Sequence, residues 1–288
     1  MPQTVLILGA SGLFGSHAAA AFQTAGWTVR RYQRGTDMAR AAMEADLIVN
    51  ALNPPKYHNW AKLIPQITGQ VIAAAKASGA TILVAGNVYV YGIAPGPWGP
   101  DTPHHPTTRK GRIRATMEAT YAKAATEGVR SIILRGGDFM AARDPRAILN
   151  MITLKPLAKG AITAFGTPTA PRAYTYLPDM ARAAVALANI RDTLPAFADI
   201  PLPGLTFSIA DLAAEITAQT GKPLAIKPFN WLQIRLLSPF WELARELLEM
   251  RYLYDLPHSL DPGPLSHLLP GFKATSLREV VAEHLQRR

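Results

Sequence analysis

The chain has 288 residues, of which 49% are hydrophobic and 17% are charged. It can therefore bury a large core, and its composition excludes an intrinsically disordered protein. The 30 Lys and Arg residues against 20 Asp and Glu residues give a formal net charge of +10, which favours anionic ligands. The basic residues are scattered and form no run interleaved with aromatic residues, so we expect no nucleic-acid partner.

Cysteine is absent, which excludes disulfides, thiolate catalysis and Cys-ligated metals. The first residues, MPQTVLILGASG, lack the basic segment of a signal peptide, so we expect a cytoplasmic protein.

The apolar stretch 229–254 is interrupted by charges and Pro239, and is too polar for a spanning helix of about 20 residues. Amphipathic helices that pack in the core or in a dimer interface explain it better, so we expect no membrane partner and leave a homodimer open. Binding to a membrane surface through Trp231, Phe240 and Trp241 is the alternative.

The first 150 residues alternate strand-like apolar runs with helix-like segments. The helices end where Gly26, Gly79 and Gly128 supply a residue suited to the left-handed position after a helix. This rhythm predicts an α/β fold with a Rossmann-like, doubly wound parallel sheet and helices on both faces. The expected strands are Val5–Leu8, Thr28–Tyr32, Leu47–Asn50, Thr81–Ala85 and Ser131–Leu134.

The regular alternation ends after Arg135, where loops rich in Pro and Gly begin. We expect a dinucleotide-binding Rossmann domain over residues 1–190, with loop 136–178 contributing to a substrate cleft, and a smaller, irregular C-terminal substrate lobe over residues 191–288. Three later helices are expected: Asp179–Ile190 with Asp179 as N-cap, Ser208–Gln219 capped by Ser208 and Asp211, and a last helix that begins at Ser276 with Glu279 in a capping box.

A glycine-rich turn lies between the first expected strand and the helical run 16–25. In this context three glycines are typical of a dinucleotide-binding site. Gly9 would allow the tight turn, Gly12 would let the backbone approach a diphosphate, and Gly15 would let the helix pack closely on the strand. The diphosphate would lie on the free N–H groups at the positive end of the helix. The candidate cofactor-binding residues here are Gly9, Ser11, Gly12, Leu13, Phe14 and Gly15.

The spacing Gly-x-x-Gly-x-x-Gly resembles that of the extended and atypical short-chain dehydrogenase/reductases, which include NAD-dependent epimerases and dehydratases. The resemblance covers most of residues 1–190 through GASGLFG, ADLIVNALNPP, ILVAGNVYVYG, ILRGGDFM and YTYLPDMARA, and continues weakly to GFKATSLREVV. It implies a Rossmann fold, a nicotinamide dinucleotide cofactor and a C-terminal lobe that holds the substrate. It does not specify a reaction.

The end of the second expected strand determines the choice of cofactor. In relatives that prefer NAD an acidic residue there bonds the adenosine ribose, whereas an Arg nearby accommodates a 2′-phosphate. Gln33 stands at the acidic position and Arg34 follows it. NADP is therefore favoured over NAD, unless the arginines of this strand are only surface charges. Beyond the third expected strand, Ala51, Leu52 and Asn53 are placed to line the adenine and diphosphate side of the site.

Members of this superfamily that transfer hydride usually use a Ser, a Tyr as proton donor and a Lys four residues after the Tyr. Here Asn87 stands in the place of the Ser, Lys110 in that of the Tyr and Arg114 in that of the Lys. All three positions depart from the pattern. Asn87 can donate to a carbonyl oxygen, and Arg114 can also hold ribose hydroxyls of the cofactor. Lys110 either protonates an oxyanion or is an exposed lysine of a first helical turn, and Tyr89 is an alternative acid.

Two further candidate sites each have a simpler, structural interpretation. Asp138, after the fifth expected strand, either caps its loop or accepts a bond from a substrate, and we favour the cap. His104 and His105 are adjacent in a Pro-rich loop and have no further ligand at a suitable spacing, so we expect no metal.

Together these features predict an NADP-dependent oxidoreductase or nucleotide-sugar epimerase-like enzyme. Its partner would be an unknown small substrate, for which an anionic compound fits the basic excess. The alternative is a non-catalytic NADP-binding sensor or scaffold protein, since relatives that have lost the Tyr and Lys can take such roles.

Overall fold

Six parallel strands form the central sheet of the computed structural model, which describes residues 2–286. The five strands expected from the sequence are confirmed to within one residue at each end, and a sixth strand, β9, was missed. In spatial order the strands are β2 (Thr28–Arg31), β1 (Thr4–Leu8), β3 (Leu47–Asn50), β4 (Thr81–Gly86), β5 (Ser131–Arg135) and β9 (Phe197–Pro201).

The direction of chain progression reverses next to β1. This strand pairs with β2 on one side, Ile7 opposite Arg31, and with β3 on the other, Leu8 opposite Asn50. In doubly wound sheets ligands bind outside the carboxyl ends of the strands at such a reversal. The glycine-rich turn after β1 and the residues after β3 therefore flank the crevice where a ligand is expected.

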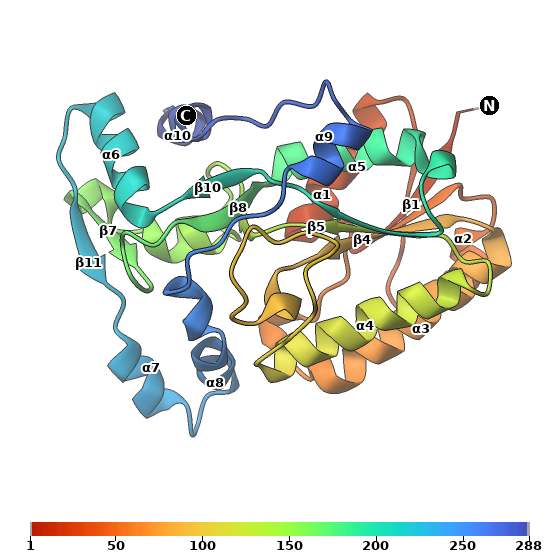
Figure 1. Cartoon of the computed structure of the whole chain (residues 1–288), viewed down its shortest axis with the longest axis horizontal. Helices are drawn as coiled ribbons and strands as arrows, with labels where there is room; N and C mark the ends of the chain where they lie inside the picture. The colour runs from red at the N-terminus through yellow and green to blue at the C-terminus, as the bar shows by residue number, and fades with distance from the viewer. Residues whose placement is uncertain (1, 287–288) are drawn as a thin grey trace.

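Helices cover both faces of this sheet (Figure 1). On one face, α1 (Leu13–Thr24) and α5 (Leu177–Asn189) pack together in one hydrophobic cluster. On the other face, α2 (Met38–Ala42), α3 (Trp60–Ser78) and α4 (Arg109–Ala125) pack in a second cluster. Strands β3 and β5 are buried at every residue, as expected of central parallel strands covered on both sides.

Two small sheets and five helices form the second part of the described chain. One sheet has the order β10 (Leu205–Phe207), β8 (Arg172–Tyr176), β6 (Asp138–Met140), and the other pairs β7 (Ala161–Ala164) with β11 (Ala225–Pro228). Because β6, β7 and β8 precede residue 190 and β9 follows it, the two parts are interleaved along the chain. The helices are α6 (Ile209–Thr220), α7 (Trp231–Leu237), α8 (Glu242–Glu249), α9 (Gly263–Leu268) and α10 (Leu277–Leu285).

Two of the three predicted N-caps are confirmed. Ser208 caps α6 in a capping box with Asp211, and Ser276 caps α10 in one with Glu279. Asp179 as N-cap is wrong, because α5 begins two residues earlier, with a proline in its first turn where its missing N–H costs nothing. The buried carboxylate of Asp179 instead accepts hydrogen bonds from Thr275 N and Oγ1 at 2.6 and 2.8 Å, and so ties the chain before α10 to α5.

None of the helices in the described residues is long and apolar enough to cross a membrane.

Candidate functional site

The glycine-rich turn has the tight geometry that the sequence predicts. Gly9 follows β1 with a φ of +81°, and the N–H of Gly12 donates to the carbonyl oxygen of Gly9 at 2.9 Å. A Cβ atom on Gly15 would lie 2.2 Å from that same oxygen. Only glycine fits at this position unless the backbone shifts, because the atom in the way belongs to the main chain. Helix α1 therefore packs as closely on the turn as a diphosphate-binding site requires.

The start of α1 offers free hydrogen-bond donors. Its N-cap is Gly12, so no side chain accepts from the N–H groups of the first turn. A positive charge lies beside them, because Arg146 donates to the carbonyl oxygen of Ser11 at 2.7 Å and to Ser16 Oγ at 3.2 Å. A groove of about 520 Å³ adjoins this point and is lined by His17 and residues 142–146. The donors and the guanidinium fit an anionic group at this end of the helix.

Sequence reasoning missed Arg146. It is 130 residues from Ser16, in a loop whose path over α1 has no periodic signal. A partial signal existed, since this loop was expected to contribute to the substrate cleft. Asp144 accepts from Arg146 at 2.6 Å and fixes the direction of its side chain, so the guanidinium is held over α1.

Gln33 and Arg34 are both exposed just past the carboxyl end of β2. The carbonyl oxygen of Gln33 accepts from Thr36 N at 3.2 Å and from Thr36 Oγ1 at 2.7 Å, which closes a turn there. By contrast, Arg30 of the same strand donates to the carbonyl oxygen of Met43. Arg30 therefore has a structural bond, whereas Arg34 is exposed just past the end of the strand.

The residues after β3 lie against the same turn. The carbonyl oxygen of Ala51 would be 3.0 Å from a Cβ atom on Gly9, and Leu52 is also in contact there. Asn53 Oδ1 accepts from Arg114 Nη2 at 2.9 Å. The structure thus brings together two predicted site residues, Asn53 and Arg114, that are 61 positions apart.

Arg114 is almost completely buried, and its guanidinium lies over the ring of Trp60 with its centre 4.7 Å away. Its Nε atom has no hydrogen-bond partner among the described residues. Burial lowers the pKa of this guanidinium. The fold encloses the Nε atom, so the part of Arg114 that is tied to the end of β3 is the Nη2 atom that donates to Asn53.

Lys110 is not the exposed lysine that one interpretation of the sequence offered. It is fully buried, and its Nζ atom lies 2.5 Å from the carboxylate of Glu246 and 2.6 Å from that of Glu249, both on α8. Arg109 also donates to Glu246. The sequence analysis did not identify Glu246 and Glu249 as partners of Lys110. They fit the polar face of an amphipathic helix and lie more than 130 residues after Lys110. Two carboxylates neutralise the lysine, which therefore holds α8 against α4.

Tyr89 lies in a hydroxyl pair that the sequence did not reveal. Its hydroxyl oxygen is 3.4 Å from that of Tyr57, a residue of the short 3-10 helix η1 (Pro55–Tyr57). Burial raises the pKa of Tyr89 well above its usual value. Asn87 Oδ1 accepts from Tyr89 N at 3.0 Å, which orients the start of this segment. Lys110 Nζ lies 4.9 Å from the centre of the Tyr57 ring, so Lys110 and Tyr89 both lie next to Tyr57.

Asp138 pairs with a cation instead of capping its loop. Its Oδ2 atom accepts from Arg172 Nη1 at 2.9 Å, across the sheet that contains β6 and β8. The preferred interpretation as a loop cap is therefore wrong. Asp138 is the first residue of β6, which pairs with β8. A strand of only three residues has no recognisable pattern in the sequence.

One group of carboxylates and histidine could in principle hold a metal: His104, Glu118 and Asp199 offer ligand atoms within 4.8 Å of one another. Arg135, which is fully buried, donates to Glu118 at 2.7 Å and to Asp199 at 2.6 Å. Because the guanidinium already compensates both carboxylates, we assign the group the structural role of joining α4, β5 and β9.

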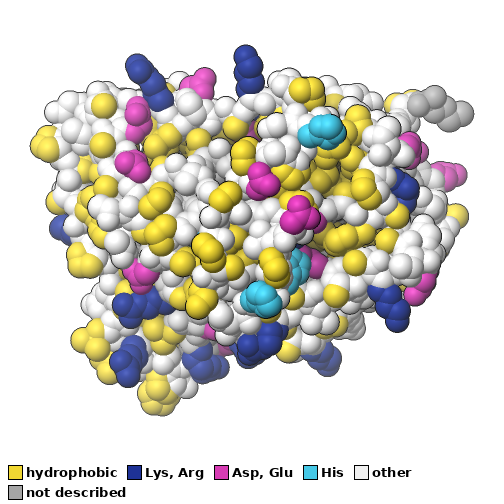
Figure 2. All heavy atoms as spheres, viewed as in Figure 1, with side chains coloured by type: hydrophobic (Ala, Val, Ile, Leu, Met, Phe, Trp, Pro, Cys, Tyr) yellow, Lys and Arg dark blue, Asp and Glu magenta, His cyan; other side chains and the backbone are white. Residues whose placement is uncertain are grey.

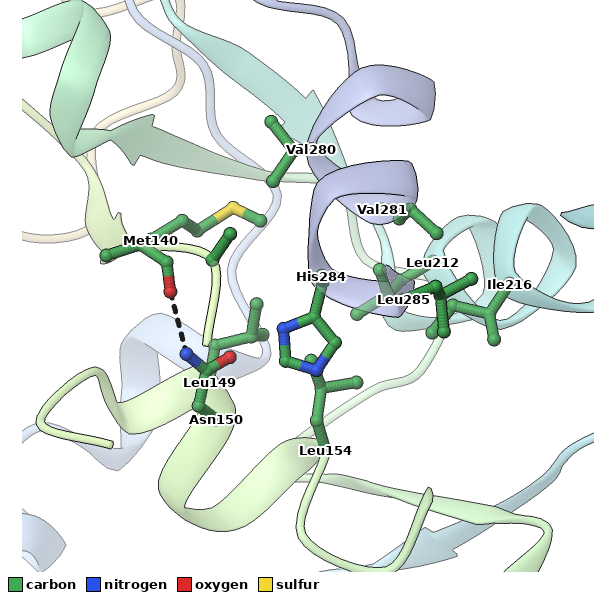
Figure 3. Close-up of a pocket in the computed structure, with 12 residues that line it drawn as sticks. Met140, Leu149, Asn150, Leu154, Leu212, Ile216, Val280, Val281, His284 and Leu285 are labelled. Carbon is green, nitrogen blue, oxygen red and sulfur yellow. Dashed lines mark hydrogen bonds between the residues drawn. The ribbon is translucent and has the colours of Figure 1, made fainter. Parts of the chain in front are cut away.

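A small apolar pocket lies where α10 faces the π-helical turn η3 (Leu149–Thr153) and shares Ala142 with the groove beside α1 (Figure 3). His284 points into it, and Asn150 Nδ2 donates to the carbonyl oxygen of Ala141 at 2.7 Å along its wall. Its volume of about 20 Å³ holds no more than about one water molecule. We therefore assign no substrate to it.

The fold and the glycine-rich turn define a Rossmann-like α/β protein. No family model and no curated protein matches the chain. Among solved structures, it is similar to MoeE5 in complex with UDP-glucuronic acid and NAD, with a TM-score of 0.76, 19% identity and coverage of 97% of each chain.

Two further solved structures have a similar fold. The UDP-glucose 4-epimerase from Brucella ovis in complex with NAD has a TM-score of 0.74 and 17% identity, and covers 97% of this chain and 96% of that chain. TunA, an NAD-dependent NDP-hexosamine 5,6-dehydratase, has a TM-score of 0.75 and 17% identity, and covers 98% and 96%. At these identities the likeness establishes the fold, which is that of NAD-dependent nucleotide-sugar epimerases and dehydratases.

Proposed function

We propose that the chain binds a nicotinamide dinucleotide at the glycine-rich turn and acts as an oxidoreductase or epimerase/dehydratase-like enzyme on a small anionic substrate. The observation that carries the proposal is the 2.2 Å approach of a Cβ on Gly15 to the carbonyl oxygen of Gly9, since such close packing opens the start of α1 to a diphosphate. Nucleotide sugars are the substrate class that the neighbouring structures favour, and UDP-glucuronic acid is bound to one of them.

Several residues of this chain fit the cofactor. The N–H groups at the start of α1 would hold the diphosphate, with Arg146 adding positive charge above Ser11. Arg114 and Asn53 would contact the ribose on the nicotinamide side. When bound, the nicotinamide supplies a hydride acceptor and donor.

Tyr89 is the group that we assign to proton transfer. Its raised pKa keeps the hydroxyl protonated at neutral pH, so it can donate to a developing oxyanion but is a poor base. The neighbouring hydroxyl of Tyr57 can return a proton along the 3.4 Å contact. Asn87 Nδ2 is a donor that can orient a substrate carbonyl or hydroxyl. Lys110 takes no part in proton transfer, because its ammonium group is held between Glu246 and Glu249.

The preference for NADP remains part of the proposal. Its support is this chain's own exposed pair Gln33 and Arg34, which replaces an acidic residue by an amide and a guanidinium. The solved neighbours named above hold NAD. A binding measurement on this protein therefore has to decide between NADP and NAD.

A calorimetric titration of variants tests the site itself. In Gly15→Ala the new Cβ collides with main-chain atoms, so we expect cofactor affinity to fall by at least about tenfold, or about 1.4 kcal/mol. The matched control is Gly69→Ala, in the interior of α3, where nothing lies within 4 Å of the new atom. Cofactor affinity that is unchanged in Gly15→Ala would show that the turn is only a packing feature.

A second candidate function, a non-catalytic dinucleotide-binding sensor, is favoured by the burial of Lys110 against α8. The two functions differ in what Tyr89→Phe does. The enzyme proposal expects turnover of a nucleotide sugar to fall by about a hundredfold with cofactor affinity intact. The sensor proposal expects no turnover with any member of a broad panel of nucleotide sugars, for wild-type protein and variant alike.

A further inference from the structure

The surface that the proposed function leaves unexplained is an apolar one at α7 and the turn that follows it. Leu236 is 68% exposed and Phe240 is 91% exposed, so the tip of this stretch does not pack in the core, and of the expected alternatives a dimer interface and a membrane surface are left. Exposure of the Phe240 ring to water contributes nothing to the stability of the folded chain. The exposed apolar residues, here called the α7 tip, are Leu232, Leu236, Leu237, Phe240 and Trp241.

The α7 tip stands on a rigid base. Trp231, at the start of α7, packs on Phe165, Phe229 and Tyr254 with ring centres 5.0 to 6.0 Å from its own. Its Nε1 atom also donates to the carbonyl oxygen of Phe165. The hairpin of α7 and α8 is therefore fixed in the fold, and its exposed side chains are displayed by an ordered segment.

The sequence that contains the α7 tip has more cations than carboxylates. From residue 216 to residue 241 the sequence has no Asp or Glu, but it has Lys222, Lys227 and Arg235. The cations continue on α8, where Arg245 donates to the carbonyl oxygen of Ser238 at 3.1 Å and so lies on the turn. Figure 2 shows this mixture of hydrophobic and basic side chains at the corner of the molecule where α7 and α8 lie in Figure 1.

The first carboxylate after this region is already partnered. Glu242 accepts from His58 Nδ1 at 3.0 Å. Farther along the chain, Arg251 adds a cation over the Trp231 ring, 5.3 Å from its centre. The surface that would cover the α7 tip must therefore be apolar within and anionic at its boundary.

We propose that the α7 tip docks on the surface of an anionic lipid bilayer. Aromatic and leucine side chains enter the boundary between headgroups and acyl chains, while Arg235 and Arg245 contact acidic headgroups. A second copy of the chain fits less well, because pairing identical surfaces would bring Arg235 and Arg245 of both copies together, with Glu242 as the one carboxylate that each copy adds next to Trp241. The inference does not depend on the cofactor site.

Vesicle flotation of the full chain tests this proposal. We expect binding to phosphatidylcholine vesicles that contain about 30% phosphatidylglycerol, and little binding to phosphatidylcholine alone. Binding should weaken as salt is raised, since headgroup contacts are screened. The double variant Leu236→Ser/Phe240→Ser should lower the partition coefficient by at least about tenfold.

The matched control is Ile93→Ser, which removes an apolar side chain that is 66% exposed on another part of the surface. It should leave vesicle binding unchanged. Arg235→Gln should reduce binding to the anionic vesicles only. Circular dichroism of each variant checks that the fold is intact.

Three results would overturn the proposal: no flotation with anionic vesicles, flotation that is equal in the double variant and wild type, or a dimer in analytical ultracentrifugation that the double variant abolishes while vesicles bind neither protein. The last result would assign the α7 tip to a second copy of the chain. None of these results bears on cofactor affinity, so the failure of one proposal is distinguishable from the failure of the other.

Discussion

Replacing Lys110 with methionine removes the cation at the contact between α4 and α8 while keeping most of its apolar volume. The carboxylates of Glu246 and Glu249 lose this partner. Their side chains are only 6% and 21% exposed. Breaking a buried ion pair on one side costs about 3 to 5 kcal/mol, since an uncompensated charge is left behind. Arg109 still donates to Glu246, so we expect the lower end, about 3 kcal/mol.

Urea unfolding of the full chain, followed by tryptophan fluorescence, measures this loss in the free energy of unfolding. The rescue control is the triple variant Lys110→Met with Glu246→Gln and Glu249→Gln, which removes all three charges and should recover at least about half of the loss. A loss below about 1 kcal/mol, together with abolished turnover, would refute the structural assignment and make Lys110 the proton donor.

Two other outcomes follow from the same structure. Burial raises the pKa of Glu246, but its bonds from Lys110 and Arg109 lower it by more, so the net shift is downward from 4.5. Its contribution to stability is therefore complete above pH 4.5 and is lost as the pH falls through the lowered value, and unfolding curves between neutral and acidic pH should show a smaller loss in Lys110→Met, in which only Arg109 still bonds Glu246. Ser208→Ala removes the N-cap of α6 and should cost about 1 kcal/mol in the same assay, whereas a change near zero would mean that the capping box contributes nothing.

The sequence was most informative where the signal is local. The glycine-rich turn, the five apolar strands and the capping boxes at Ser208 and Ser276 each lie within a few residues, and the structure has them where they were expected. Strand β9 was missed because it follows Pro195 closely and ends in a proline itself. The three-residue strands β6 and β10 are too short for a pattern of alternation to distinguish them from loop.

The partners of the candidate site residues could not be predicted in this way. Lys110 was correctly placed on the first turn of a helix, but the acids that neutralise it come from α8, 136 and 139 positions later. Tyr57 likewise reaches the site from the short 3-10 helix η1, and Arg146 from a loop. Such pairs depend on how the second part of the chain folds back onto the first, which periodicity and composition do not encode.

A calorimetric titration of the purified chain with NADPH and with NADH, at one moderate salt concentration, tests the central proposal most directly. We predict that NADPH binds, and that NADH binds at least about tenfold more weakly, a difference of about 1.4 kcal/mol that Arg34→Ala should remove. NADH binding as tightly as NADPH would leave the site standing and contradict only the role of Arg34. If neither cofactor binds, the account is wrong, and the glycine-rich turn is a feature of packing alone.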